Sequence, residues 1–302
     1  MELRLAAVLV VAFVGFASAG PRRGPAVAAP AAEQHLIDLL KHVCTDVTEE
    51  VKHEAPARFT DLVHSLKSMP HATLTKVHRQ VRGQELCSST KLVDLWNDAL
   101  IMDASEGSLK LVAEQIIRKE VSAARANYLL TMMALSRRPT AGAIRAVLPI
   151  LDEKHVPRQA LLGISALIRN VRVSGQQPQE LHKAVQAIAK YMANNSQQPD
   201  RVIAALKALQ NIGTISQALD QVIRLTSDSS QKSGVRVAAI EALQGMASEQ
   251  QVRSKCQKLF ENSREDAEIR IAAYKVLVES GDHKTIQKIL ETMRKENEDQ
   301  GE

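Results

Sequence analysis

A repeat of about 34 residues constrains the fold of this 302-residue chain more than any other feature. The segment "EIRIAAYKVL" (268–277) aligns without gaps on "GVRVAAIEAL" (234–243), and "AALKAL" (204–209) aligns on "AAIEAL" (238–243). A fainter copy, "GISAL" (163–167), lies 42 residues before "ALKAL". Segments that recur at this interval are typical of α-solenoids, in which each helix pair buries its apolar face by stacking on the next pair.

The last copy shows what each repeat contributes. Its apolar residues recur at i, i+3, i+4, i+7 and i+8, which is one stripe of an α-helix: Ile269, Ala272, Ala273, Val276 and Leu277. Gly281 follows as a helix stop. Between the copies we expect second helices at 215–225 and 252–260. Aromatic residues make up only 3% of the chain, too few for a typical β-sandwich or barrel. The sequence predicts an all-α, HEAT-like, right-handed α-solenoid of stacked helix pairs.

The amino terminus has the pattern of a signal peptide over residues 1–19. The apolar run "LAAVLVVAFVGF" (5–16) is too short to span a bilayer, and "ASA" (17–19) is a small-residue cleavage site. Residues 20–32 are rich in Pro, Gly and Ala, which predicts a disordered leader. We therefore expect secretion through the endoplasmic reticulum, with a retained lumenal protein as the alternative, and no transmembrane segment.

Three cysteines enter that oxidising compartment. Cys256 lies on the apolar face of its helix, which predicts an inert core thiol. Cys44 and Cys87, both in the amino-terminal part, are the more natural disulfide pair, although spacing alone does not settle connectivity. The triplet Asn-Asn-Ser makes Asn194 a candidate N-glycosylation site.

Charge is unevenly distributed along the chain. Residues 121–179 carry eight arginines and lysines against two acids, whereas residues 261–302 are acidic. A basic patch attracts anionic headgroups, and the candidates for this contact are Arg125, Arg137, Arg138 and Arg145. Ordinary solvated helix faces are the alternative interpretation. A nucleic-acid partner is not expected in a secreted chain with so few aromatics.

No pattern in the sequence predicts catalysis. "GISAL" lacks the second glycine of a nucleophile elbow, and "KHEAP" (52–56) has no second histidine four residues on. The nine histidines are scattered, whereas a metal site needs three or four converging ligands. We expect neither an enzyme nor a bound metal or cofactor.

Three segments resemble the helical domain of the large lipid transfer proteins, the superfamily of vitellogenins, apolipophorins, apolipoprotein B and microsomal triglyceride transfer protein. The most recognisable is "LFENSREDAEIRIAAYKVLVES" (259–280). A second, 95–144, carries Trp96, Asp98-Ala99-Leu100 and the helix start Pro139-Thr140. The third is 58–82. The Gly-Thr usual in the family after "DAL" is replaced in "MDASEG", so we expect the local geometry to differ there.

The resemblance implies lipid carriage in secreted or lumenal compartments. In full-length members the helical domain wraps around β-sheets that line a lipid cavity, after an amino-terminal β-barrel-like domain. Here we expect the helical domain alone, over 33–297, followed by an acidic tail at 298–302, without the barrel and the cavity sheets.

Two functions follow as hypotheses. The first is a secreted lipid-transport protein that binds lipid or a lipoprotein surface through its helices. The alternative is an interaction scaffold that docks on a full-length lipid transfer protein or another secreted partner. A plain helical scaffold with a polar inner face is a third. No residue pattern identifies the lipid class or the oligomeric state.

Overall fold

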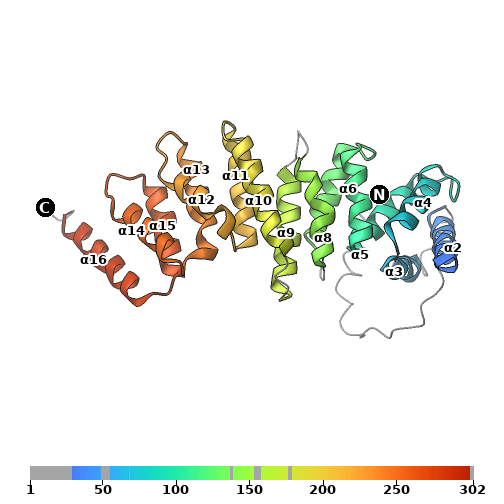
Figure 1. Ribbon diagram of the computed structural model, residues 1–302, viewed down its shortest axis with the longest axis horizontal. Helices are drawn as coiled ribbons and strands as arrows, with labels where there is room; N and C mark the ends of the chain where they lie inside the picture. Colours follow the sequence, from blue (N-terminus) through green and yellow to red (C-terminus); the bar gives the residue numbers. More distant parts are fainter. Residues whose placement is uncertain are drawn as a thin grey trace. The chain divides into compact units, whose positions relative to one another are not determined.

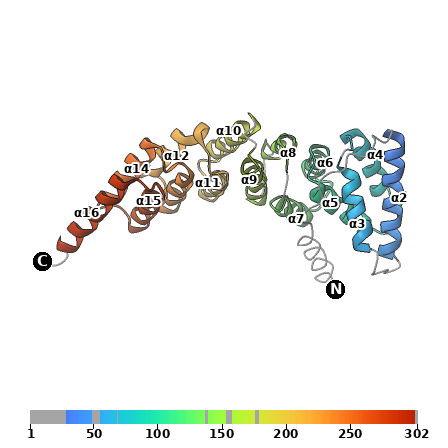
Figure 2. The same cartoon turned by 90° about the horizontal axis from the view of Figure 1, so that it is seen from below.

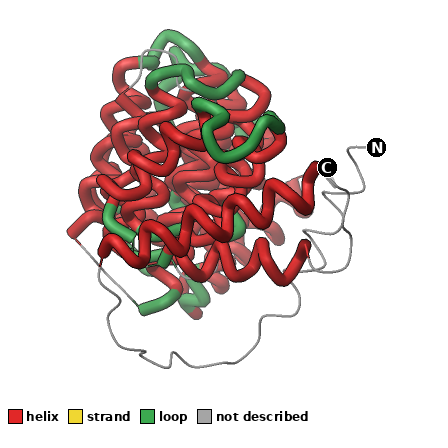
Figure 3. The backbone as a smooth tube through the Cα atoms, turned by 90° about the vertical axis from the view of Figure 1, so that its right-hand side faces the viewer, coloured by secondary structure: helices red, strands yellow, loops and turns green. Residues whose placement is uncertain are grey.

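The computed structural model describes residues 29–48, 55–67, 69–136, 139–152, 158–175 and 179–299, with side chains up to residue 296. Within these ranges the chain forms helices and turns and no strand, as the colours of Figure 3 show. The predicted all-α class is confirmed. The signal peptide and most of the expected leader lie outside the described residues, and the right-handed sense of the superhelix stays a prediction.

The chain divides into two compact units, Met1–Asp103 and Ala104–Glu302. The described helices of the first unit are α2 (Ala29–Thr48), α3 (Ala55–Leu66), α4 (His71–Arg82) and α5 (Lys91–Asp103) (Figure 1). Helix α5 packs against the other three and carries Trp96, which is fully buried. Arg58 of α3 forms an ion pair with the buried Asp46 of α2 at 2.7 Å. This unit therefore has a core of its own.

The second unit holds the remaining described helices. In chain order they are α6 (Glu106–Ile117), α7 (Ala123–Met133), α8 (Ala141–Val147) with the 3-10 turn η1 (Leu148–Asp152), α9 (Arg158–Val173), α10 (Gln179–Asn194), α11 (Pro199–Ile212), η2 (Ser216–Ala218), α12 (Leu219–Thr226), α13 (Ser233–Ala242), η3 (Gln244–Met246), α14 (Gln250–Glu261), α15 (Ala267–Glu279) and α16 (His283–Asp299).

These helices form two layers. Helices α7, α9, α11, α13 and α15 pack on one another in that order, and we call this row the odd layer. Helices α8, α10, α12 and α14 pack against one side of this row and form the even layer, which lies above the odd layer in Figure 2. Each even helix packs on the odd helix that follows it, α8 on α9, α10 on α11, α12 on α13 and α14 on α15, and each such pair is one unit of the stack.

The aligned sequence copies occupy equivalent places in the odd layer. The Ala-Ala pairs at 204–205, 238–239 and 272–273 are all buried, on α11, α13 and α15 respectively. Gly163, the equivalent residue of the fainter copy, lies so close to α7 that an added Cβ would come within 1.9 Å of the Leu130 carbonyl oxygen. Small residues at this position let successive helices approach closely, as the repeat predicts.

The stripe and stop predicted for α15 are correct, the predicted start of one helix shifts, and two helices extend into segments expected to lie outside the helical domain. Helix α15 buries all five residues of the predicted stripe, and Gly281 follows it at φ 62°. The expected helix at 215–225 begins instead with η2, so α12 starts at Leu219. Helix α2 starts at Ala29, inside the expected leader, because Pro30 and the alanines around it suit the first turn of a helix. At the other end α16 continues to Asp299, so the tail begins as helix.

The "MDASEG" turn has an unusual backbone. Ala104 adopts φ 53°, a left-handed conformation that costs a residue with a side chain about 1 kcal/mol. Ser105 then caps α6, accepting a hydrogen bond from the Ser108 backbone N–H at 3.3 Å. Thr140 caps α8 in the same way, which confirms the expected Pro-Thr helix start.

Candidate functional site

Exposed large hydrophobic side chains are unevenly distributed over the helices of the second unit. The large hydrophobic residues that the described part of the chain exposes are Tyr128, Leu135, Val173, Ile271, Val278, Leu290 and Met293. They lie on α7 or just after it, at the end of α9, on α15 and on α16. Helices α8, α10, α12 and α14 contribute none of them. Helices α11 and α13 of the odd layer also contribute none, so the exposed apolar side chains lie towards the two ends of the odd layer and on α16.

Four of these residues form what we call the terminal patch. Ile271 and Val278 lie two turns apart on one face of α15 and are 53% and 43% exposed. Leu290 and Met293 lie one turn apart on the neighbouring α16 and are 48% and 42% exposed. Terminal repeats of a solenoid normally present a polar outer face. A contiguous exposed apolar patch marks a contact surface, and these four side chains on two neighbouring helices are the candidates for one.

The terminal patch is held in place by charge and packing. Arg270 of α15 forms an ion pair with Glu296 of α16 and donates from Nε to the carbonyl of Phe260 in α14 at 2.9 Å. The buried Ile289 also anchors α16. Because these contacts occupy the other faces of α15 and α16, the exposed stripes face away from the core.

The arginines of the basic segment have different surroundings. Arg145 on α8 lies between two carboxylates, with Nη2 at 3.0 Å from Oε2 of Glu106 and Nη1 at 2.5 Å from Oε1 of Glu180. Hydrogen bonds to Glu106 and Glu180 raise the pKa of Arg145. Its charge is therefore offset within the protein. Arg125 on α7 lies over the ring of the exposed Tyr128, 4.8 Å from the ring centroid. Arg137 and Arg138 lie outside the described residues.

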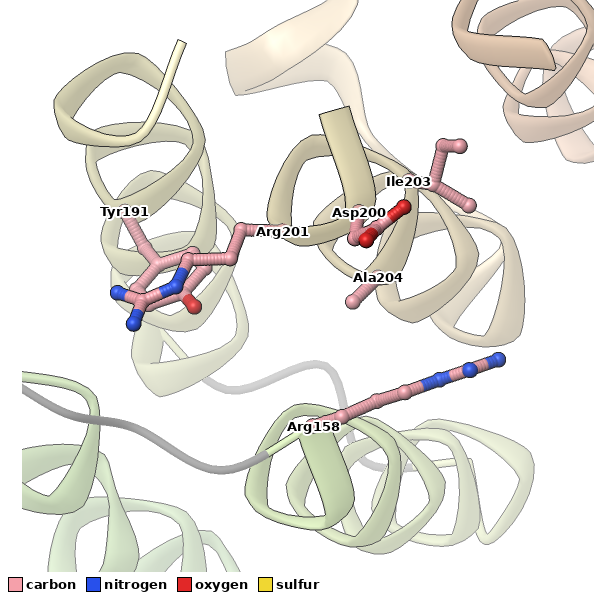
Figure 4. A pocket seen from close by; sticks show the side chains of 6 residues that line it. All are labelled: Arg158, Tyr191, Asp200, Arg201, Ile203 and Ala204. Atoms are coloured by element: carbon pink, nitrogen blue, oxygen red, sulfur yellow. The ribbon is translucent and has the colours of Figure 1, made fainter. Parts of the chain in front are cut away.

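A cavity of about 290 Å³ lies between α9, α10 and α11 (Figure 4). It is lined by Arg158, Tyr191, Asp200, Arg201, Ile203 and Ala204. In Figure 4 the Arg201 guanidinium lies against Tyr191, and its Nη1 donates to Oδ1 of Asn195 at 3.0 Å. Burial raises the pKa of Tyr191. A cavity this small and this charged does not suit an acyl chain, because lipid sites are lined mainly by apolar side chains.

The described part of the chain brings no three His, Cys, Asp or Glu side chains together in a way that could hold a metal ion. Of the helices with described positions, none has both the length and the apolar composition needed to cross a bilayer.

The model of the Vitellogenin TPR domain family matches residues 30–300. The chain belongs to this family. The match starts one residue after α2 begins and ends one residue after α16. The Vitellogenin TPR domain therefore spans both compact units.

Curated relatives and a solved structure agree with this family. The chain is 27% identical over 190 residues to apolipophorins of Locusta migratoria, covering 61% of this chain and 6% of that protein. It is 23% identical over 202 residues to vitellogenin of Penaeus merguiensis, covering 63% of this chain and 8% of that protein. A structure of lipovitellin, determined for its lipid–protein interactions, matches 92% of this chain and 29% of its own with TM-score 0.71 and 18% identity. The chain thus spans under a tenth of the length of these two relatives, and the lipovitellin match shows the fold.

The structure also describes the three cysteines and Asn194, the remaining residues that the sequence analysis singled out. A disulfide joins Cys44 of α2 to Cys87, with a Cα–Cα distance of 5.8 Å. Cys256 is a buried free thiol, which confirms its prediction as a core residue. Asn194 is exposed and is the last residue of α10.

The sequence predictions did not include the terminal patch. Ile271 and Val278 lie on the side of α15 opposite the buried Ala272 and Val276, so the repeat alignment treats them as surface. The i, i+7 spacing of Ile271 and Val278 was the only sequence feature that could have indicated a second apolar face on α15. Ordinary solvent-exposed helix faces have the same spacing, and the tertiary structure is needed to show that no described neighbour covers these two side chains.

Proposed function

We propose that this chain is a secreted lipid-binding protein that lies on a lipid or lipoprotein surface through the odd layer and the terminal patch. The single observation that carries the proposal is the distribution of exposed large hydrophobic residues among the described helices of the second unit. They occur on or beside α7, α9, α15 and α16, whereas the even layer exposes none and neither do α11 and α13. Membership of the Vitellogenin TPR domain family and the fold shared with lipovitellin support a lipid role.

We propose contact at the surface and not in the cavity between α9, α10 and α11. Arg158, Asp200 and Arg201 contribute to the lining of that 290 Å³ cavity, whereas the four terminal-patch residues are about half exposed. Each such side chain gains about 1 kcal/mol when its remaining surface enters an apolar phase. Four of them together favour adsorption by about 4 kcal/mol, enough for reversible binding.

Arg125 and Tyr128 would assist at the surface. Tyrosine suits a lipid–water interface because its ring is apolar and its hydroxyl is polar. A guanidinium stacked over that ring places a positive charge at headgroup level. We do not assign this role to Arg145, because Glu106 and Glu180 already offset its charge.

The first experiment is a lipid analysis of the native secreted protein, purified without detergent and extracted for mass spectrometry. Several phospholipid or neutral-lipid molecules per chain, enriched over a matched secreted protein, are expected. Lipid-free protein that also fails to float with phosphatidylcholine vesicles would overturn lipid binding.

Variants test which surface is used. The double substitution Ile271→Asp with Leu290→Asp should weaken flotation with phosphatidylcholine vesicles at least tenfold, since it removes two apolar contacts and adds two charges. The control is Gln186→Asp with Gln251→Asp, which makes the same charge change at exposed positions of α10 and α14. Equal losses in both variants would show that charge, and not the terminal patch, governs binding.

A second function is favoured by the exposure of the terminal patch on α15 and α16, the last two helices that the structure describes. In a solenoid the next repeat or another element normally covers such a face. We therefore keep, as the second candidate, a scaffold that docks on a full-length lipid transfer protein. This hypothesis predicts that the chain is free of lipid and co-purifies with such a protein from the secreted fraction. The Ile271→Asp variant should no longer co-purify with that partner.

A further inference from the structure

Asn194 begins a turn in which the next side chain, that of Asn195, forms hydrogen bonds within the protein. Helix α10 ends at Asn194, and α11 begins at Pro199. Between them the Asn195 amide donates to the Tyr191 carbonyl at 2.8 Å, and its Oδ1 accepts from Arg201 at 3.0 Å. Asn195 therefore points inward and holds the turn.

The residues on either side of Asn195 point outward. Asn194 and Ser196 are both exposed, so the acceptor amide and the hydroxyl that an oligosaccharyltransferase must recognise are both accessible. Gln197 follows Ser196, so no proline blocks the triplet. In the full sequence no other asparagine is followed two residues later by serine or threonine.

The place of this turn in the fold is compatible with a bulky, hydrated group. Helix α10 belongs to the even layer, which exposes none of the large hydrophobic side chains. A glycan on this helix end would cover no apolar contact surface. It would also prevent a lipid surface or a protein partner from approaching closely at this end of α10.

We propose that Asn194 carries an N-linked glycan and that this glycan keeps the α10 end of the even layer in solvent. The proposal goes beyond lipid binding and shares with the proposed function only the passage through the endoplasmic reticulum. The Cys44–Cys87 disulfide fits the same compartment.

The test is expression of the full chain in animal cells behind a heterologous secretion signal, so that entry does not depend on its own first residues. Treatment with peptide-N-glycosidase F should speed its migration and convert Asn194 to aspartate, as peptide mass spectrometry reads directly. Asn194→Gln and Ser196→Ala should each remove the mobility shift, whereas Ser196→Thr should keep it. Secreted chain with an unmodified Asn194 peptide, in both the native and the Ser196→Thr forms, would overturn the proposal.

A separate measurement distinguishes this proposal from the lipid hypothesis. If the glycan lies away from the lipid-contact face, Asn194→Gln should leave vesicle flotation within twofold of the native protein, while Ile271→Asp with Leu290→Asp weakens it. A glycosylated chain that does not bind vesicles would remove the proposed function and leave the modification site standing.

Discussion

Arg236 of α13 forms an ion pair with Glu265, which precedes α15, through two hydrogen bonds: Nη1 donates to Oε1 at 3.0 Å and Nη2 donates to Oε2 at 2.6 Å. The Nε of Arg236 also donates to the carbonyl of Thr226, the last residue of α12, at 3.1 Å. One side chain thus joins the preceding helix, its own helix and the turn before α15. Helix C-termini favour such a cation because their carbonyls carry partial negative charge.

The same arrangement recurs 34 residues later. Arg270 donates from Nε to Phe260 in the last turn of α14 and pairs with Glu296 of α16. In both cases the carbonyl acceptor stands ten residues before the arginine. The repeat therefore conserves an interaction between neighbours within this chain, in addition to an apolar stripe.

Removing the Arg236 guanidinium should destabilise the second unit. Both partners are mostly buried, with side chains 13% and 15% exposed. Arg236→Ala removes both guanidinium donors from Glu265 and leaves it the Asp266 backbone N–H at 3.1 Å. We expect a loss of about 2–3 kcal/mol, measured by urea unfolding. Arg294→Ala, at an exposed position of α16, is the control and should change stability by less than about 0.5 kcal/mol. Equal effects would show that the Arg236–Glu265 pair contributes no specific stability.

The same pair predicts a pH dependence. Hydrogen bonding to Arg236 lowers the pKa of Glu265 below its ordinary value. The unfolded chain therefore binds this proton at a higher pH than the folded chain does. The stabilisation is fully present above about pH 4.5 and is lost as pH falls through the lowered pKa. The native protein should lose more stability than Glu265→Gln between neutral pH and pH of about 3. Parallel curves would contradict the assignment.

Gly163 should tolerate no side chain. Alanine is the better helix former by about 1 kcal/mol, which would favour the substitution. An added Cβ 1.9 Å from the Leu130 carbonyl forces α7 and α9 apart, however, and overpacking of this kind costs about 1–3 kcal/mol or more. We expect Gly163→Ala to lower the thermal unfolding midpoint. Gly234→Ala on α13, where the added Cβ meets only Ile203 at 3.9 Å, should raise or preserve it.

Replacing Ala104 by glycine should stabilise the protein. Its φ of 53° suits glycine, so Ala104→Gly relieves strain and should stabilise the chain by about 0.5–1 kcal/mol. Ala193→Gly, at an exposed position inside α10, makes the same chemical change in ordinary helix and should destabilise by a similar amount. A loss of stability in both variants would argue against the left-handed conformation.

The three cysteines should differ in reactivity. Burial raises the pKa of the Cys256 thiol to about 12, so it should resist iodoacetamide at pH of about 8 until the protein unfolds. Replacing Cys44 and Cys87 by alanine opens a loop with a separation of 43 residues and should cost about 2–4 kcal/mol. Alkylation of Cys256 in the folded protein, detected by mass spectrometry, would contradict its burial.

Local pattern was enough to predict the helices and their buried faces. The stripe of α15 and its stop at Gly281 follow from helical spacing and backbone freedom, which depend on neighbours within a few residues. The recurrence at 34 residues predicts stacking, because an isolated helix pair cannot bury two Ala-Ala faces. Family membership was predictable as well, since the order of several segments carries it.

The contact surface and the roles of the charges required the fold. The sequence alone does not show that Arg145 pairs with Glu106 and Glu180, which lie 39 and 35 residues away. Nor does it show that Arg125 lies over the ring of Tyr128. Helical spacing places Ile271 off the buried stripe of α15, but it does not show whether another helix covers that face; packing leaves Ile271 53% exposed. Pairing of charges and covering of faces depend on residues distant in the chain, so spacing along a single helix does not encode them.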